Sequence, residues 1–220
     1  MSIDVEACEV GRPLRADAAR NRELILETAA VVFAEHGLDA GYDEIARRAG
    51  IGVGTVYRRF PERDELVAAL FESRIAEMIA IADQAEARAD AWDGLTWFLE
   101  KALERQVADR GLKELLIRTI TDEAHMAIGR DRIGPILERL VSRAQDAGSL
   151  RADIGSTDIG MQLMTLSSMT VPEQPDLWRR YLALMFDALR ARPDQVALPL
   201  KAPDDEALYE LMCNVHGRRV

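Results

Sequence analysis

Cysteine is scarce in this chain of 220 residues, which has Cys8 near its beginning and Cys213 near its end. Two cysteines so far apart provide neither a disulfide framework nor the paired-cysteine spacing of a structural zinc site. Because disulfides belong to oxidising compartments, a reducing compartment is the simplest setting. We therefore expect the protein to be cytoplasmic.

Long hydrophobic runs are also missing. No stretch approaches the roughly 20 apolar residues that a transmembrane helix needs, and the opening MSIDVEACEV has neither the basic nor the apolar region of a signal peptide. Hydrophobic residues nevertheless make up 48% of the chain and charged residues 30%, which is typical of a soluble globular protein. We expect one or two domains, a sizeable core and no membrane partner.

Sustained alternation of apolar and polar residues, the pattern of a half-buried strand, is absent. Apolar residues recur instead with helical spacing, as do Ile25, Ala29, Val32 and Phe33. Further helices are expected over Leu112 to Ile120, in IGPILERLVSRAQDAG, with Pro135 near its start and Gly148 past its end, and in PDLWRRYLALMFDALRAR. The apolar residues of this last segment cover most of its circumference, which indicates burial on several sides, either in a core or against a second subunit.

Two short helices near the N-terminus are joined by a glycine-containing turn. YDEIARRA is closed by Gly50, and GTVYRRF ends before Pro61, with AGIG between them. This arrangement predicts a helix-turn-helix. Although the chain has a formal net charge of -10, the segment from Asp43 to Arg63 carries five arginines (47, 48, 58, 59, 63) against three acids (43, 44, 62). This segment is thus basic while the rest of the chain is acidic, and we expect the acidic remainder to disfavour nonspecific DNA contact.

The same segment resembles the DNA-binding domain of the TetR family of bacterial transcriptional regulators. The resemblance is carried by ILETAAVVFAEHGLDA (25–40), DEIARRAGIGVGTVYRRFP (43–61) and ERDELVAALF (62–71). It implies an all-α fold, with an N-terminal three-helix helix-turn-helix domain and a C-terminal helical bundle for ligand binding and dimerisation. The expected ranges are a flexible arm (1–16), the DNA-binding domain (17–65), the ligand-binding and dimerisation domain (66–193) and a C-terminal extension (194–220).

The resemblance also implies how such a protein works. It implies a homodimer formed through the C-terminal helices, a pseudo-palindromic DNA operator read in the major groove, and a small-molecule effector that releases the DNA. Repression is the expected mode. The residues beyond 193 contain Pro193, Pro199 and Pro203 and are expected to form a loose extension with one short helix, DEALYELMCNV.

Several residues suit contact with DNA. Gly54 lets a helix approach without a side chain in the way, Thr55 offers a hydroxyl for a phosphate or a methyl for thymine, and Tyr57 offers its hydroxyl to a phosphate. Arginines contact phosphates or make bidentate bonds to guanine, and phosphate contacts position a protein while base contacts specify the sequence. The predicted DNA-binding residues are Tyr42, Val53, Gly54, Thr55, Tyr57, Arg58, Arg59 and Arg63.

The chain departs from the family pattern at two positions. Val53 stands where a polar residue is common, and Gly41 stands where Ser or Thr usually caps the helix, a loss for which Tyr42 is expected to compensate. Arg47 and Arg48 are expected on a solvated face rather than at bases. The basic N-terminal arm either reaches along the minor groove of DNA or is a disordered, solvated segment, and both alternatives stay open. Its arginines are Arg12, Arg15, Arg20 and Arg22.

An enzyme, or a helical small-molecule-binding protein that uses a C-terminal cavity, is the alternative function. Asp122, Glu123 and His125 lie close together in DEAHM, but such a trio is more often a solvated helix end than an acid-base or metal cluster. The sequence has no nucleophile elbow and no phosphate-binding glycine loop, so we predict no catalytic residue, no metal and no cofactor. The effector is unknown, and the following side chains line its pocket or belong to the core: Trp92, Trp97, Phe98, Met126, Met161, Met164 and Met169.

Overall fold

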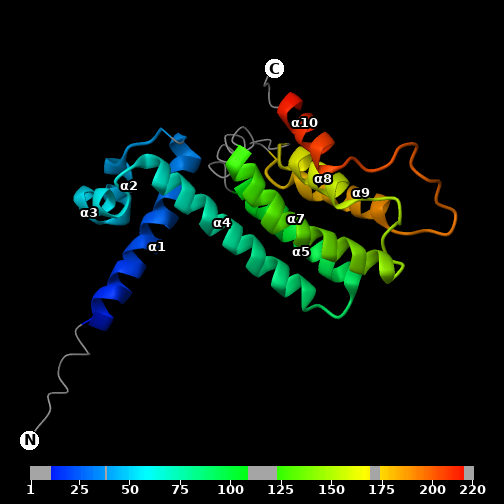
Figure 1. The fold of residues 1–220 in the computed structure, drawn as a ribbon, viewed down its shortest axis with the longest axis horizontal. Helices are drawn as coiled ribbons and strands as arrows, with labels where there is room; N and C mark the ends of the chain where they lie inside the picture. The colour runs from blue at the N-terminus through cyan, green and yellow to red at the C-terminus, as the bar shows by residue number, and fades with distance from the viewer. Residues whose placement is uncertain (1–10, 38, 109–122, 169–173, 216–220) are drawn as a thin grey trace, which may run out of the picture. The chain divides into compact units, whose positions relative to one another are not determined.

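The computed structural model describes the backbone of residues 11–37, 39–108, 123–168 and 174–215, and side chains within 20–37, 39–107, 131–167, 174–208 and 210–211. In these ranges the chain forms helices and no strand, apart from an isolated antiparallel bridge between Leu150 and Arg190 (Figure 1). The predicted all-α fold is therefore confirmed. The helix expected over Leu112 to Ile120 lies outside the described residues.

The chain divides into two compact units at a boundary inside the fourth helix, between Ser73 and Arg74. The first unit contains α1 (Gly11–His36), α2 (Tyr42–Ala49), α3 (Val53–Arg59) and the first turns of α4 (Arg63–Glu86). These turns belong to it because Leu66 and Leu70 are buried there. The four predicted domain ranges stay predictions.

Helix α1 is longer than its apolar pattern indicated. The expected stripe of Ile25, Ala29, Val32 and Phe33 is buried, and the helix ends where Gly37 takes a φ of 78° and donates its N–H to the Phe33 carbonyl over 2.9 Å. At the other end α1 begins at Gly11, inside the range expected to be a flexible arm. Residues 11–16 are thus helical, since the polar and alanine-rich stretch before the stripe continues the helix without a break.

The second unit is built on α5 (Ala91–Ala108), α7 (Glu123–Asp146), α8 (Ser156–Ser168), α9 (Leu177–Leu189) and α10 (Asp205–Val215). Helix α5 packs against α7 and α8, while α8 also packs against α9 and α10. Among the described residues, no helix is both long and apolar enough to cross a bilayer. The centre of the core is formed by large buried side chains: Leu95, Phe98, Leu99, Leu103, Leu140, Ile159, Trp178 and Leu182.

Helix α7 differs from its prediction at Pro135. The helix does not begin there but at Glu123, so Pro135 lies inside it on the exposed side. A proline removes one backbone hydrogen bond from a helix but leaves the bonds further along intact. Further along, Arg143 donates to the carbonyls of Glu86, Arg88 and Ala89 and so joins α7 to the end of α4.

Helix α9 is buried on one side only. Trp178, Leu182, Met185 and Leu189 face the core, whereas Leu184 is 55% exposed and Tyr181 is also exposed. Of the two alternatives for this segment, a fully central core helix is therefore excluded within the described chain. An apolar side of α9 remains open.

The segment after α9 is not loose as expected. Residues 191–204, which we call the strap, run from α9 to α10 and are held by hydrogen bonds to the loop between α7 and α8 and to the start of α8 (Figure 1). The prolines exclude regular helix here but leave the neighbouring carbonyls and amides free to bond. The predicted short helix is present as α10.

Candidate DNA-binding site

The turn between α2 and α3 depends on a glycine. Gly50 adopts a φ of 67°, and its N–H faces the carbonyls of Ala46 and Arg47 at the end of α2. Residues with a Cβ rarely adopt this left-handed conformation, which explains why glycine ends the helix. Helix α3 follows after Gly52, whose carbonyl accepts a hydrogen bond from Thr55 N–H over 2.8 Å. The predicted helix-turn-helix is thus formed, with α3 beginning at Val53.

Helix α3 has an inner and an outer side. Val56 is fully buried and Phe60, directly after the helix, is also buried, as their assignment to the core predicted. On the outer side Tyr57 is 55% exposed, and Arg58 and Arg59 are exposed. Gly54 is exposed too, and a Cβ added to it would meet no atom within 4 Å. The outer side therefore offers two cations and a hydroxyl beside a gap in the side-chain surface.

Thr55 and Arg58 form a pair within α3. The Arg58 Nη2 donates to Thr55 Oγ1 over 3.1 Å. Since a guanidinium has five N–H donors, this bond orients Arg58 while leaving donors for a phosphate or a base. Val53 is half-buried at the first turn, where it offers only apolar contact.

Tyr42 has a supporting position rather than an outward one. Its side chain is 7% exposed, and its hydroxyl donates to the Glu62 carbonyl over 3.2 Å. Burial raises the pKa of this hydroxyl, which keeps it protonated as the donor. Gly41 caps α2 without a side-chain bond, as expected, but Tyr42 does not supply a free hydroxyl in its place. The Tyr42 hydroxyl thus serves the turn before α4, and its predicted contact with DNA stays a prediction.

Arg63 and Arg22 both lie over aromatic rings of this unit. Arg63 donates to the Ala40 carbonyl over 2.9 Å, and its guanidinium lies 5.7 Å from the centre of the Phe33 ring. Arg22 lies 5.9 Å from the centre of the Phe60 ring. Arg63 is thus anchored at the start of α4 with donors to spare. Arg22 belongs to α1 and lies against the domain, and both alternatives for the N-terminal arginines stay open. Side chains of Arg12 and Arg15 lie outside the described residues.

The arginines of α2 are paired with acids, as expected for a solvated face. Arg47 and Arg48 both donate to the carboxylate of Glu44, and Arg48 also bonds Glu35 over 2.6 Å. These hydrogen bonds, first from Arg47 and then from Arg48, lower the pKa of Glu44 to about 2. The cluster holds α2 to α1 through side chains outside the α3 surface.

The proposed pocket residues of the second unit are mainly packing residues where they are described. Phe98 is buried, Trp92 lies edge-on to Phe186 and under the Arg190 guanidinium, and Trp97 lies under Arg88. Met161 and Met164 are half-buried on α8, while the side chains of Met126, Met169, Glu123 and His125 and all of Asp122 lie outside the described residues. In the described chain, no three His, Cys, Asp or Glu side chains gather as a metal site.

Two family models match the chain. Residues 25–70 match the model of bacterial regulatory proteins of the tetR family, and residues 90–191 match the C-terminal domain of SbtR-like transcriptional regulators. The first match covers α2, α3 and the parts of α1 and α4 described above, and the second covers α5 to α9. The first match thus lies within the first unit, and the described residues of the second match lie in the second unit.

Individual proteins agree with both models. The chain is 32% identical to a TetR transcriptional regulator, SCO0520, from Streptomyces coelicolor, covering 78% of this chain and 99% of that one with a TM-score of 0.64. A TetR transcription regulatory protein from Mycobacterium vanbaalenii is also 32% identical, over 81% of this chain and 100% of that one, with a TM-score of 0.64. The uncharacterised HTH-type regulator Rv2250c of Mycobacterium tuberculosis is 32% identical over 62% of this chain and 72% of that protein. The chain therefore belongs to the TetR family of bacterial transcriptional regulators, a family of DNA-binding proteins that are generally not enzymes.

Proposed function

We propose that this regulator is a homodimeric, ligand-responsive repressor that places α3 in successive major grooves of a pseudo-palindromic operator. The observation that carries the proposal is the two-sided structure of α3. Val56 holds the helix to the domain, while Gly54, Tyr57 and Arg59 lie on its exposed surface. A helix that presents a hydroxyl, cations and a close-approach glycine suits contact with phosphates and base edges.

The dimer in this proposal forms through the C-terminal helices. Leu184 and Tyr181 are exposed on α9, and a shallow open hollow in the surface of this helix is lined by Arg180, Ala183 and Leu184. Large exposed apolar side chains on a helix that also packs on a core favour contact with another protein surface. In a two-fold dimer the same face of both copies would meet.

The effector acts in this account by selecting one of two dimer states. A small molecule bound in the second unit favours a separation of the two α3 helices that no longer matches the DNA repeat. It shifts the equilibrium only by its difference in affinity for the two states. Helix α4 is the natural connection because it is continuous from Arg63 to Glu86 and belongs to both compact units. The repressor would act in the cytoplasm, where the DNA lies.

Selection from a random DNA pool tests the DNA-binding part of the proposal. Purified protein is expected to enrich two inverted half-sites whose centres lie about one helical turn, or a multiple of it, apart. Tyr57→Ala and Arg59→Ala should each weaken binding to the selected DNA about tenfold or more, because each removes a charge-assisted contact.

Arg139→Ala is the matched control. Arg139 is an exposed arginine of α7, bonded to Glu86 and distant in sequence from the helix-turn-helix. Its loss should leave DNA affinity within about twofold, as expected for a single surface ion pair. Enrichment of no sequence, or equal losses from Arg59→Ala and Arg139→Ala, would contradict the assignment of α3 and favour a ligand-binding or enzymatic role for the second unit.

A further inference from the structure

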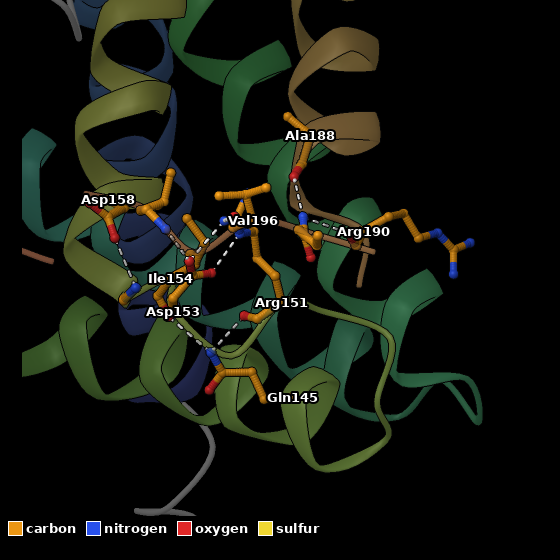
Figure 2. Close-up of polar contacts among 11 residues, drawn as sticks. Gln145, Arg151, Asp153, Ile154, Asp158, Ala188, Arg190 and Val196 are labelled. Carbon is orange, nitrogen blue, oxygen red and sulfur yellow. Dashed lines mark hydrogen bonds and ion pairs between the residues drawn. The ribbon is translucent and has the colours of Figure 1, made fainter. Parts of the chain in front are cut away.

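The strap, residues 191–204, is gripped by a charged pair in the loop between α7 and α8. Arg151 and Asp153 bond each other through two hydrogen bonds of 2.5 and 2.8 Å. Arg151 Nη2 also donates to the Val196 carbonyl over 3.1 Å, and the Asp153 Oδ2 accepts from Leu198 N–H over 2.8 Å (Figure 2). The strap is therefore held by its backbone on both sides of Ala197.

Further bonds fix the two ends of the strap. At its start, Ala191 N–H donates to the Ser149 carbonyl. Gln195 donates to the carbonyls of Ala188 and Arg190 at the end of α9, both labelled in Figure 2. At its end, Thr157 Oγ1 donates to the Pro203 carbonyl over 2.7 Å. The backbone of the strap is thus pre-organised, which reduces the entropy lost when its side chains bind another surface.

Three aliphatic side chains of the strap lie at the surface. Val196 is 85% exposed, Leu200 is 82% exposed, and Leu198 between them is also exposed. A fixed backbone that presents a row of exposed aliphatic side chains is the arrangement expected of an interaction surface. This surface is not shared with the SbtR-like C-terminal family model, whose match ends at residue 191.

The position of the row points to its occupant. Leu184 and Ala188 lie on the same side of α9, one helical turn apart, and both are exposed. Gln195 bonds the Ala188 carbonyl, and Val196 follows directly. The apolar row of the strap therefore begins where the exposed apolar side of α9 ends, so a molecule that covers Leu184 would reach Val196 next.

We propose that the strap extends the homodimer interface, with Val196, Leu198 and Leu200 packing against a second copy of this chain beside the α9 contact. The proposal rests on the proposed function, which brings the α9 faces of two copies together. Two-fold symmetry then buries two straps in each dimer, so that each substitution in the strap acts twice.

Sedimentation velocity with fluorescence detection, over nanomolar to micromolar protein, tests this proposal on the full chain. The variants are Val196→Ser combined with Leu200→Ser, Leu184→Glu on α9, and Val31→Ser on α1 as a control for the loss of a half-exposed aliphatic side chain. The double variant should raise the dimer dissociation constant at least tenfold. Val31→Ser should change it less than twofold, and Leu184→Glu should give a monomer. At protein concentrations low enough for every variant to be monomeric, all variants should have the melting temperature of the wild-type monomer, since the substituted side chains are exposed.

The results separate the two proposals. A wild-type dissociation constant for the double variant, together with a monomeric Leu184→Glu variant, would overturn the role of the strap and leave the α9 dimer in place. A wild-type protein that is monomeric over the whole range would overturn both. A weakened dimer in the double variant, with an unchanged control, would support the strap as part of the interface.

Discussion

The ring of Tyr57 lies against the ring of Tyr42, with their centres 4.9 Å apart and their planes tilted by 60°. Tyr42 is buried and fixed by its hydrogen bond to the Glu62 carbonyl, whereas Tyr57 is exposed on α3. A buried residue of α2 therefore supports an outward residue of α3. In the proposed complex, such support would orient the Tyr57 hydroxyl before DNA arrives and lower the entropic cost of its contact.

Substitutions of Gly54 are expected to change DNA affinity without preventing folding. Because a side chain at this exposed helical position would meet no atom of the protein, Gly54→Ala should raise the free energy of unfolding by about 0.5–1 kcal/mol through helix propensity. Gly54→Glu should also fold, but its bulk and charge at the DNA surface should weaken binding by about 100-fold or more, against a much smaller loss for alanine. Urea unfolding and fluorescence anisotropy measure the two effects, and tight binding by Gly54→Glu would contradict the close approach of α3.

Arg143 is expected to be a major stabilising residue of the second unit. Its side chain is half-buried and donates to three backbone carbonyls at the end of α4, which have no helical partners. Arg143→Ala should therefore lower the free energy of unfolding by about 2–3 kcal/mol, since three backbone carbonyls lose a charged donor in bonds of which two are partly buried. The neighbouring Arg139 makes an exposed ion pair with Glu86, so Arg139→Ala should cost less than about 1 kcal/mol. Equal losses in chemical denaturation would contradict this difference.

The Glu44 cluster predicts a contribution to stability that depends on pH. The pKa of Glu44 falls from an ordinary 4.5 to about 2 because Arg47 and Arg48 bind its ionised form. A carboxylate with a lowered pKa stabilises the fold fully above its ordinary pKa, and this contribution is lost as the pH falls from about 4.5 to about 2. Carboxyl NMR titration should give this low pKa, and Glu44→Gln should flatten the stability profile in that window. A Glu44 pKa near 4.5 would show that the arginines do not hold it.

Gly155 is expected to be required for docking of the strap. A Cβ at this position would lie 2.8 Å from the Cβ of Ala202, too close for either to stay in place. Gly155→Ala should therefore loosen the strap and speed tryptic cleavage after the exposed Lys201 several-fold, whereas Gly160→Ala on α8, where a Cβ has no close neighbour, should not. Equal cleavage rates in both variants would mean that the strap tolerates displacement at Ala202.

The helix-turn-helix was predictable because its signals are local. Gly50 must adopt a positive φ to end α2, Val56 and Phe60 repeat at helical spacing, and Pro61 stops α3. Helical periodicity likewise predicted that the segment of α9 is a helix, but not which of its sides is buried. Such features depend on neighbours within a few residues, which a sequence displays directly.

Other features depend on contacts between distant residues and could not be predicted. The role of Tyr42 requires Glu62, and the clamp of Arg143 requires carbonyls more than 50 residues away in the sequence. The strap looked loose because its prolines and polar residues carry no periodic pattern, yet Arg151 and Asp153 hold it through its backbone. Every residue has a backbone carbonyl, so the sequence does not indicate which carbonyl accepts a hydrogen bond from a distant side chain.

The salt dependence of selective DNA binding tests the central claim most directly. Fluorescence anisotropy with the selected operator should show tight binding that weakens steeply with salt, with a slope of log K against log salt of about -4 to -5 if four to six phosphates are contacted per dimer. Arg59→Ala should reduce the magnitude of this slope by about 2, because two copies of the residue are lost. Binding without sequence preference, or a slope that Arg59→Ala leaves unchanged, would contradict the claim that α3 of this protein reads DNA.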